Sequence, residues 1–541
     1  MSGDAAAHAS AQEQARAFVE EVEARVDPLM RDTGLFSWEA ATGGGEAALE
    51  RASAARTALS LLFADAEGAR KVRGWLEGGA IADPLLRRRL ELLGHEFTRN
   101  QLPPDTIRDL VNRGAELEHV FHTFRSTFRG ERLSNNELLE AFQGSVDSEV
   151  RRQAWEASKE IGREVAEPLR ELVRRRNAAA RSLGFEHYYA MELHLQELGE
   201  DRLFAVLDEF RDRTDEPFRR FRAEMDERLA ERFGVAPDAL RPWHWDDFFA
   251  QEAPSVSGRV ELDAWFRERD LVETAAGFFR GIGLEVDDVL ARSDLFEREG
   301  KDQHAFCVDV DRQGDVRVLC NLRPNEKWMG TLLHELGHAA YDRYIPAELP
   351  FTLRTIAHTL STEAIAMYMG RLTRDPAWLR DVVAAEVDDA QAADIGAQQR
   401  AAMLVSARWI LVMVYFEREL YRDPERDDLN TLWWDLVERL QCIRRPDGRD
   451  EPDWASKIHL SLSPVYYHNY LLGELMASQV SAHARRQVPA GRSIAGHPQV
   501  GAFLRDRIFA PGATLGWNEL MVHATGEELS PGYFVEEFVG A

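Results

Sequence analysis

The sequence predicts a mainly α-helical protein with one small β-hairpin. Apolar residues recur at spacings of three and four, among many charged residues, over residues 10–33, 46–77 and 83–99. The same pattern continues over 104–200, and the charge-rich stretch from Glu200 to Glu231 is typical of a long helix with a solvated face. These segments follow one another without a repeat or a low-complexity linker, which favours one helical body over separable domains.

Local signals place boundaries between the helices. Gly43-Gly44-Gly45 and Pro103-Pro104 interrupt the first segments, because glycine and proline disfavour the interior of a helix. Ser134-Asn135-Asn136-Glu137 has the composition of a helix start, in which serine and glutamate side chains bond the first backbone amides. A helix is therefore expected to begin there.

The exception to the helical pattern lies just before the most informative stretch of the chain. Residues 304–310 and 315–320 are rich in strand-forming residues and flank the turn-forming segment 311–314, so they predict a β-hairpin. Cys307 and Cys320 stand on opposite strands of it. An edge strand could pair with an extended peptide through backbone hydrogen bonds, and a hairpin that only packs is equally consistent with the sequence.

The composition disfavours several classes of protein. A net charge of −27 argues against nucleic acid and against an anionic membrane as partners. The longest apolar run, from Ala401 to Phe416, contains Arg408 and is too short and too polar to span a bilayer. The N-terminus lacks the basic start and apolar core of a secretory signal, and three cysteines make no disulfide framework. We therefore expect a cytoplasmic protein with reduced thiols.

A metal-binding pattern follows the hairpin. His334 and His338, in Leu333-His334-Glu335-Leu336-Gly337-His338, are four residues apart and project from one face of a helix. Two imidazoles at that spacing can bind one zinc ion, and Glu335 between them can act on a water molecule at the open position of the metal. Glu363, in a second helical pattern, is the best candidate for a third ligand.

The alternative is that the two histidines are hydrogen-bonded core residues that bind no metal. Pro324-Asn325-Glu326 gives a plausible helix start with proline in the first turn, and Trp328, Leu332 and Leu336 then recur at helical spacing. The histidines therefore lie on a largely buried helix. Burying such polar groups is costly unless something offsets the lost hydration, and a metal ion does so. We predict one Zn²⁺ per chain and a zinc peptidase.

A second group of polar residues lies near the C-terminus. His459 and the tyrosines Tyr466, Tyr467 and Tyr470 could donate hydrogen bonds to the oxyanion that forms when an amide carbonyl is attacked. Clustered tyrosines are also common in ordinary packing. Lys457 is one of five lysines against 61 arginines, and its compact ammonium suits a substrate carboxylate.

Together these stretches resemble the angiotensin-converting-enzyme family of zinc metallopeptidases, within the gluzincin group that includes thimet oligopeptidase and the oligoendopeptidases. The blocks that carry the resemblance are, in chain order, Glu156–Gly162, Leu172–Ala180, His304-Ala305, His334–His338, Leu349–Arg354, Glu363–Ile365, Lys457–His459, Gly512–Trp517 and Thr525–Phe534. The resemblance implies a helical ellipsoid with a deep central channel that admits short peptides and excludes folded proteins.

The resemblance also implies a role for each matching residue. The residues implied to bind zinc are His334, His338 and Glu363, with Glu335 as general base and then as proton donor to the leaving amine. His304 and the backbone of Ala305 are implied to hold the substrate. His459 and a tyrosine are implied to stabilise the tetrahedral intermediate. Lys457 and Tyr466 are implied to receive the C-terminal carboxylate of the substrate.

The departures from the family pattern are specific. The position of the family's catalytic tyrosine is Asn469 here, so we expect Tyr470 to take that role, with Tyr466 second. Ser463-Pro464-Val465-Tyr466 matches a pattern of the oligoendopeptidases. The family's arginine linked to chloride has no clear counterpart, and an aspartate that supports a zinc histidine is replaced by Met367. Support for that histidine must come from another residue.

The sequence thus predicts zinc-dependent hydrolysis of short peptides inside an enclosed channel, as in a peptidyl-dipeptidase. The alternatives are an oligoendopeptidase that cuts internally and a catalytically inactive, zinc-stabilised helical binding protein. We expect one catalytic unit with two helical lobes over 1–541 and leave its oligomeric state open. Residues 1–145 would form an N-terminal helical cover, and 146–541 would carry the zinc site (300–370) and the oxyanion and substrate segment (455–475).

Overall fold

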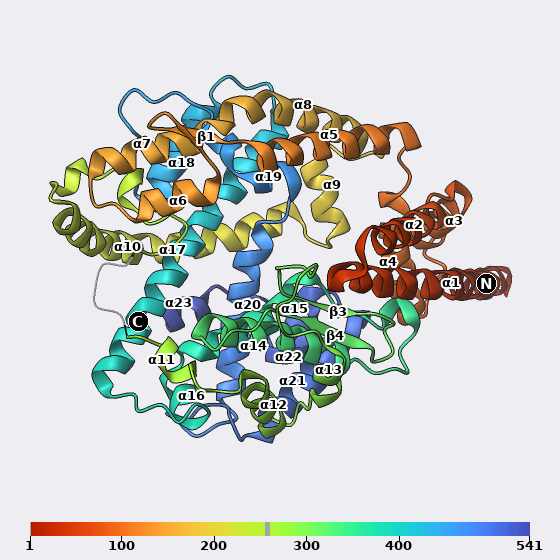
Figure 1. The fold of residues 1–541 in the computed structure, drawn as a ribbon. Helices are drawn as coiled ribbons and strands as arrows, with labels where there is room; N and C mark the ends of the chain where they lie inside the picture. Colours follow the sequence, from red (N-terminus) through yellow and green to blue (C-terminus); the bar gives the residue numbers. More distant parts are fainter. Residues whose placement is uncertain (1, 255–259, 541) are drawn as a thin grey trace. The chain divides into compact units, whose positions relative to one another are not determined.

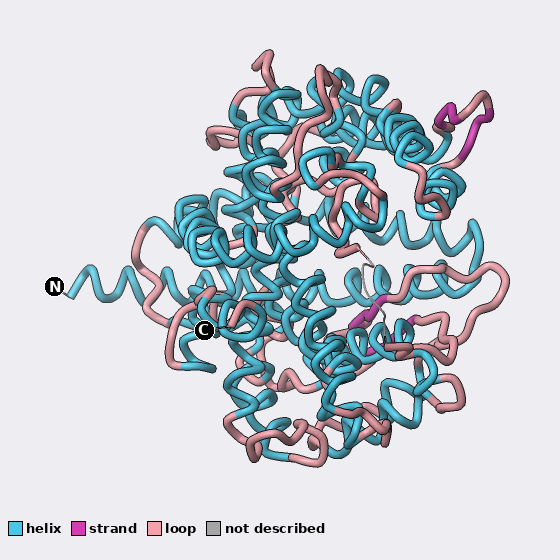
Figure 2. Tube along the Cα trace, turned by 90° about the vertical axis from the view of Figure 1, so that its left-hand side faces the viewer, coloured by secondary structure: helices cyan, strands magenta, loops and turns pink. Residues whose placement is uncertain are grey.

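The computed structural model describes residues 2–254 and 260–540. The described chain is built from helices, with two small antiparallel sheets of two strands each (Figures 1 and 2). The prediction of a mainly α-helical fold is confirmed. The chain divides into two compact units, which we call the first unit (1–101, 261–392 and 473–530) and the second unit (102–260, 393–472 and 531–541). The expected roles of 1–145 and 146–541 stay predictions.

The first unit contains the N-terminal helices and the predicted metal site. Its helices and strands are α1 (Ser2–Glu39), α2 (Gly45–Phe63), α3 (Ala66–Glu77), α4 (Pro84–Arg99), α11 (Asp263–Phe266), α12 (Leu271–Gly281), α13 (Asp287–Arg292), β3 (Phe306–Asp309), β4 (Val316–Leu319), α14 (Glu326–Arg343), α15 (Thr359–Gly370), α16 (Pro376–Asp381), α21 (Pro498–Leu504) and α22 (Trp517–Thr525).

The second unit contains the predicted oxyanion and substrate segment. Its helices and strands are α5 (Pro104–Thr123), β1 (Ser126–Phe128), β2 (Glu131–Leu133), α6 (Asn135–Gln143), α7 (Ser148–Lys159), α8 (Ile161–Ser182), α9 (Tyr188–Leu195), α10 (Glu200–Phe233), α18 (Leu429–Gln441), α19 (Ile458–Leu462) and α23 (Gly532–Phe538). Two helices have residues in both units, α17 (Asp389–Arg422) and α20 (His468–Arg485).

The N-terminal helices of the first unit are attached to the segment that follows α14. The core between α1 and α4 is apolar and includes Val19, Leu90 and Phe97. Within it, Arg89 and Glu23 form a buried pair with two hydrogen bonds of 3.0 and 2.6 Å. The same Glu23 carboxylate accepts hydrogen bonds from the backbone and hydroxyl of Thr352. A paired and fully bonded carboxylate is the form in which burial of charge is tolerated.

The predicted hairpin is present, and the sequence missed a second one. In the first unit β3 pairs with β4, and both strands pack against α14. In the second unit β1 pairs with β2 through a two-residue turn, Arg129-Gly130. Both turn residues have positive φ (52° and 84°), as a tight hairpin turn requires. The strands are only three residues long, so they left no periodic signal inside a stretch that was predicted to be helical.

Several local predictions hold. Ser134 and Glu137 form the expected capping box at the start of α6. The stretch from Glu200 to Glu231 lies in the long helix α10, and the run from Ala401 to Phe416 lies in α17, where most of its side chains are buried. Within the described residues, no helix has both the length and the apolar composition that are needed to cross a bilayer.

Candidate active site

Helix α14 presents the predicted motif at its centre. Asn325 caps its N-terminus by accepting a hydrogen bond from the backbone of Trp328. The expectation that Pro324 lies in the first turn is wrong, because the helix begins one residue after the asparagine cap. Leu332, Leu336 and neighbouring apolar side chains bury the helix, as their spacing predicted. The sequence therefore places His334 and His338 on one face, one turn apart.

Three side chains of the first unit come together as a possible metal site. The Nε2 atoms of His334 and His338 lie 3.8 and 3.9 Å from Oε2 of Glu363. Ligand atoms of the three residues all lie within 4.8 Å of one another, and they are the only such group found among the described residues. Two ligands each about 2.1 Å from one zinc ion are separated by at most about 4.2 Å. The two imidazole–carboxylate distances therefore fit a shared ion.

The chemistry of these donors also fits zinc. Burial lowers the pKa of His334 to about 4 and, with a contribution from His334, lowers that of His338 to about 3. Both imidazoles are thus neutral at neutral pH, which is the form that binds a metal. Burial raises the pKa of Glu363, and burial followed by the charge of Glu363 raises the pKa of Glu335 to about 8. A cation at this position would lower both carboxyl pKa values.

The close packing of α14 on α15 brings Glu363 to the histidines, and it depends on Gly337. A Cβ atom at Gly337 would lie 2.8 Å from the Cα of Ala366 and 3.1 Å from its nitrogen. Both of these are backbone atoms, so only glycine allows the two helices to approach this closely. The second free position of the histidine motif is therefore a packing position, which the motif by itself does not reveal.

We predict that Gly337→Ala weakens zinc binding. The added methyl group must push α15 away from α14, and Glu363 moves with α15. We expect a loss of zinc affinity of about tenfold or more, together with a loss of stability of about 1–3 kcal/mol from overpacking. Competition with a fluorescent chelator and a thermal melt would measure the two effects.

Gly330→Ala is the matched control, since it adds the same methyl group to the same helix two turns earlier. Its nearest contact would be 3.4 Å, to the Thr373 hydroxyl, which is an ordinary distance. Alanine is a better helix former than glycine, so this variant should keep its zinc affinity and its melting temperature. Equal zinc affinity in both variants would contradict the role given to Gly337.

His338 has a partner that the sequence analysis did not identify. Its Nδ1 atom lies 2.7 Å from the hydroxyl oxygen of Thr362. When Nδ1–H donates to that oxygen, Nε2 keeps its lone pair for a metal. Thr362 precedes Glu363 on α15, so one turn of helix supplies both a ligand and the support for another.

Thr362→Val should lower the zinc affinity about 10- to 100-fold, the usual effect of removing a hydrogen bond to a metal-binding histidine. Valine keeps the shape of the side chain and removes only the hydroxyl. Thr331→Val makes the same change on α14, where the hydroxyl donates to the carbonyl of Lys327, and should leave the affinity unchanged. Metal titration of both variants checks this, and an unaltered affinity in Thr362→Val would contradict the assignment.

The residues predicted to hold substrate beside the metal lie at the start of the hairpin. His304 and Ala305 immediately precede β3, and the His304 side chain is 95% exposed, with Nδ1 3.5 Å from a carboxylate oxygen of Asp302. Among the described strands β3 pairs with β4 alone, while the other side of β4 bonds to the backbone of Asp294 through Val318 and Cys320. One side of β3 is thus open in the described sheet. The register places Cys307 opposite Val318, so Cys320 is not its cross-strand partner, and both thiols are free.

In the second unit, Lys457 is buried beside a residue that the sequence analysis missed. Its ammonium group donates to Oε1 of Gln251 at 2.7 Å and lies 5.0 Å from the ring centre of Phe249. Burial lowers the pKa of Lys457 to about 8, and Asp247 and Glu252 act in the opposite direction. No sequence motif marks Gln251, and its position beside Lys457 is set by the conformation of the loop that carries it.

Asp247 shapes that loop. Its carboxylate accepts backbone hydrogen bonds from Phe249, Gln251 and Glu252, and Ala250 between them has a φ of 52°. A left-handed alanine is costly, and the three hydrogen bonds hold it in place. The loop therefore presents Phe249 and Gln251 together to Lys457.

The predicted oxyanion residues of the second unit form one aromatic cluster. The ring of His459 lies 5.1 Å from that of Tyr467, and the ring of Tyr470 lies 5.3 Å from Tyr467 and 5.4 Å from Tyr466. The Tyr467 hydroxyl accepts a hydrogen bond from the Trp409 indole at 2.9 Å. Burial, followed by the charge of Lys457, lowers the pKa of His459 to about 4, so this imidazole is neutral at neutral pH.

The helical fold and the group His334, Glu335, His338 and Glu363 define a class of metallopeptidase in which one helix supplies two histidines and the next supplies a glutamate. Comparison with protein families agrees. The sequence model of the family described as angiotensin-converting enzyme matches residues 9–235 and 252–536 of this chain. The chain therefore belongs to the angiotensin-converting enzyme family, a family of zinc metallopeptidases.

Proposed function

We propose that this protein is a zinc-dependent peptidyl-dipeptidase that releases dipeptides from the C-terminus of short peptides. The observation that carries the proposal is the convergence of two neutral imidazoles and the Glu363 carboxylate, with buried Glu335 between the histidines on the same helix. A zinc ion held there would supply Lewis-acid chemistry, polarising the scissile carbonyl and lowering the pKa of water.

The proposed proton transfers belong to Glu335. This carboxylate takes a proton from the attacking water and passes it to the nitrogen of the departing amine. Negative charge then develops on the former carbonyl oxygen, where we propose that Tyr470 and His459 donate hydrogen bonds. We assign Tyr470 because it lies one residue after the position of the family's catalytic tyrosine. Tyr466 is the second candidate.

We infer the substrate contacts from the charged group of Lys457 and from the side of β3 that pairs with no described strand. Lys457 and Gln251, which are bonded to each other, would receive the C-terminal carboxylate together with Tyr466. His304 and the backbone of Ala305 would hold the peptide as it lies along β3. Binding of a free carboxylate two residues beyond the scissile bond would then determine which peptide bond is cleaved. An enclosed channel would limit substrates to short peptides. Three free thiols support the proposed cytoplasmic location.

Product analysis tests the proposal directly. A decapeptide of defined sequence is incubated with the zinc-loaded enzyme, and the products are followed by mass spectrometry over time, with and without a chelator. We expect successive loss of C-terminal dipeptides that stops when zinc is removed. Internal cuts at positions independent of the C-terminus would identify an oligoendopeptidase instead. Chelator-sensitive zinc binding without any product would identify an inactive binding protein.

A further inference from the structure

The loop that leads into the proposed oxyanion tyrosines contains a backbone conformation that its sequence disfavours. Val465, between α19 and α20, has a φ of 55° and is fully buried. Of the non-glycine residues with positive φ in the described chain, it is the only one with a β-branched side chain. Such a side chain clashes with the backbone in the left-handed region, so this conformation persists only where the surroundings impose it. Tyr466 follows directly, and Tyr470 lies in the first turn of α20.

Both polar groups of the Val465 backbone are bonded to side chains from distant segments. Its N–H donates to Oε1 of Glu417 at 2.8 Å, and its carbonyl accepts from Nε2 of Gln196 at 3.1 Å. Glu417 belongs to α17 and is 3% exposed, whereas Gln196 directly follows α9 and is half-buried. We call Glu417 and Gln196 the Val465 clamp. Since it holds the groups on both sides of the Val465 Cα atom, the clamp opposes rotation of this residue into a relaxed conformation.

Gln196 also connects the loop to the start of α20. Its Oε1 atom accepts a hydrogen bond from Nδ2 of Asn469 at 3.3 Å and lies 3.2 Å from Nε2 of His468. Both partners are buried, and they directly precede Tyr470. One side chain thus contacts the strained residue and the two residues before the tyrosine, which fixes their relative positions.

The other end of the loop is fixed by α8. Arg176 is buried and donates to the carbonyl of Ser461, in α19, at 2.9 Å and to the Tyr421 hydroxyl at 3.0 Å. Burial raises the pKa of Glu417 to about 8, and the hydrogen bond from Val465 and the charge of Arg176 act in the opposite direction. At neutral pH this carboxyl group is therefore largely protonated, and either form has an oxygen that can accept from Val465.

We propose that Glu417 and Gln196 are positioning residues for peptide hydrolysis. They hold Val465 in its left-handed conformation and so keep Tyr470 where its hydroxyl can donate to the developing oxyanion. The inference rests on the proposed function, since the position of the tyrosine matters only if it binds that oxyanion. Donors to an oxyanion act because they are oriented before the reaction, so a loop that relaxes should lose catalysis before it loses substrate binding.

Glu417→Met and Gln196→Met each remove one half of the clamp and keep a side chain of similar length. We expect kcat to fall about 10- to 100-fold in each, the effect of a small displacement of a catalytic group. KM should change little, because the proposed contact of Lys457 with the substrate is intact. Glu417→Gln retains an acceptor oxygen and should keep most of the wild-type kcat. Hydrogen exchange over 463–470, followed by mass spectrometry without substrate, should be faster in both methionine variants.

Val465→Gly separates positioning from stability. Glycine adopts a φ of 55° without strain, so Glu417→Met combined with Val465→Gly should recover part of the lost kcat. The same change removes a fully buried side chain, so the double variant should melt at a lower temperature than Glu417→Met alone. If Glu417 only stabilised the fold, the less stable double variant would not be the more active one.

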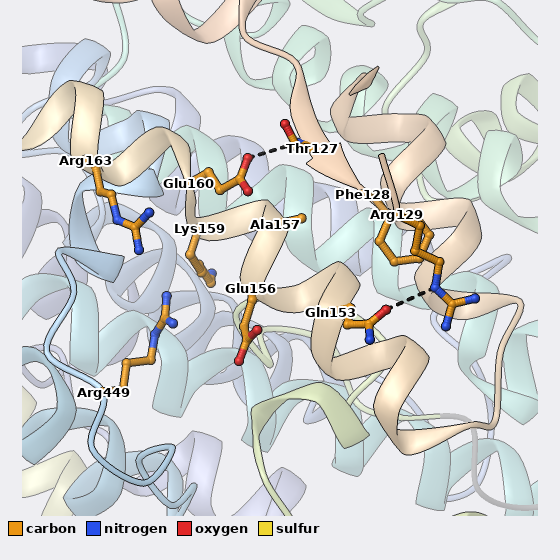
Figure 3. Close-up of a pocket in the computed structure, with 10 residues that line it drawn as sticks. All are labelled: Thr127, Phe128, Arg129, Gln153, Glu156, Ala157, Lys159, Glu160, Arg163 and Arg449. Carbon is orange, nitrogen blue, oxygen red and sulfur yellow. Dashed lines mark hydrogen bonds between the residues drawn. The ribbon is translucent and has the colours of Figure 1, made fainter. Parts of the chain in front are cut away.

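Gln153→Met is the matched control for Gln196→Met. Gln153 is a half-buried glutamine of the same unit and is also bonded through both ends of its amide, accepting from Nε of Arg129 at 3.0 Å and donating to Glu149 at 2.8 Å. Figure 3 shows the bond to Arg129 in a cavity that is lined by residues of α7 and of the β1–β2 hairpin. This variant should keep the wild-type kcat and the wild-type exchange over 463–470.

Tyr470→Phe distinguishes failure of this inference from failure of the proposed function. If Tyr470→Phe lowers kcat and the two methionine variants do not, the tyrosine keeps its role and the clamp is overturned. If Tyr470→Phe leaves kcat unchanged, the role given to the tyrosine is wrong and the inference is overturned with it. Equal losses of kcat in Gln196→Met and Gln153→Met would also overturn it. Gln196 lies at the half-buried end of a helix, so its variant should fold even where Glu417→Met does not.

Discussion

Glu335→Gln is expected to retain zinc and lose catalysis. Glutamine has the size of glutamate and can occupy the same buried position between the two histidines, but it cannot accept a proton from water. The loss of a positioned general base lowers kcat by about 10²–10⁴, and here the same group also returns the proton to the leaving amine. Metal analysis together with peptide hydrolysis rates measures both properties in one preparation.

Glu348→Gln is the appropriate control for this variant. Glu348 is exposed in the segment after α14, and the change removes the same charge from the same unit. It should leave both zinc content and kcat unchanged. Hydrolysis by zinc-loaded Glu335→Gln at a rate near that of the wild type would show that the proton is carried by another group. Loss of zinc would show that Glu335 is part of the metal site itself.

The grouping of the candidate metal ligands was largely predictable because most of it is local. The spacing of His334 and His338 on one helix follows from the period of the helix alone, and the asparagine cap at its start is a short-range signal. Glu363 is a different case, since its position depends on how α15 packs against α14. That packing depends on Gly337, whose role is visible only once a neighbouring backbone lies 2.8 Å from where its Cβ would be.

The features that sequence reasoning missed depend on contacts between distant segments. The role of Thr362 can be recognised only from the position of its hydroxyl beside His338. The role of Gln251 can be recognised only from its hydrogen bond to Lys457, which lies 206 positions further along the chain. Lys159 illustrates the same limit. A lysine in a helical segment with many charges predicts a solvated side chain. Its burial under aromatic rings follows from the fold of the second unit.

Lys457→Met should abolish the preference for a free C-terminus. The buried ammonium would form a charge-assisted hydrogen bond with the substrate carboxylate, and losing it should lower kcat/KM about 10- to 100-fold for a peptide with a free C-terminus. An amidated peptide lacks the negative charge, so the wild type should cleave it slowly and the variant should treat both peptides alike. If Lys457 binds the carboxylate, the effects of the substitution and of the amidation on kcat/KM are not additive, and the difference measures the lysine–carboxylate interaction.

The pH dependence gives the same interaction an independent signature. Burial places the pKa of Lys457 near 8, so the lysine is charged below that pH and neutral above it. Because kcat/KM reports the free enzyme, its value for the free peptide should fall as the pH rises through about 8. The value for the amidated peptide, or for Lys457→Met with either peptide, should lack this fall. If the wild type cleaves both peptides equally well at every pH, Lys457 does not receive the carboxylate, and an enzyme that cuts internally explains the site better.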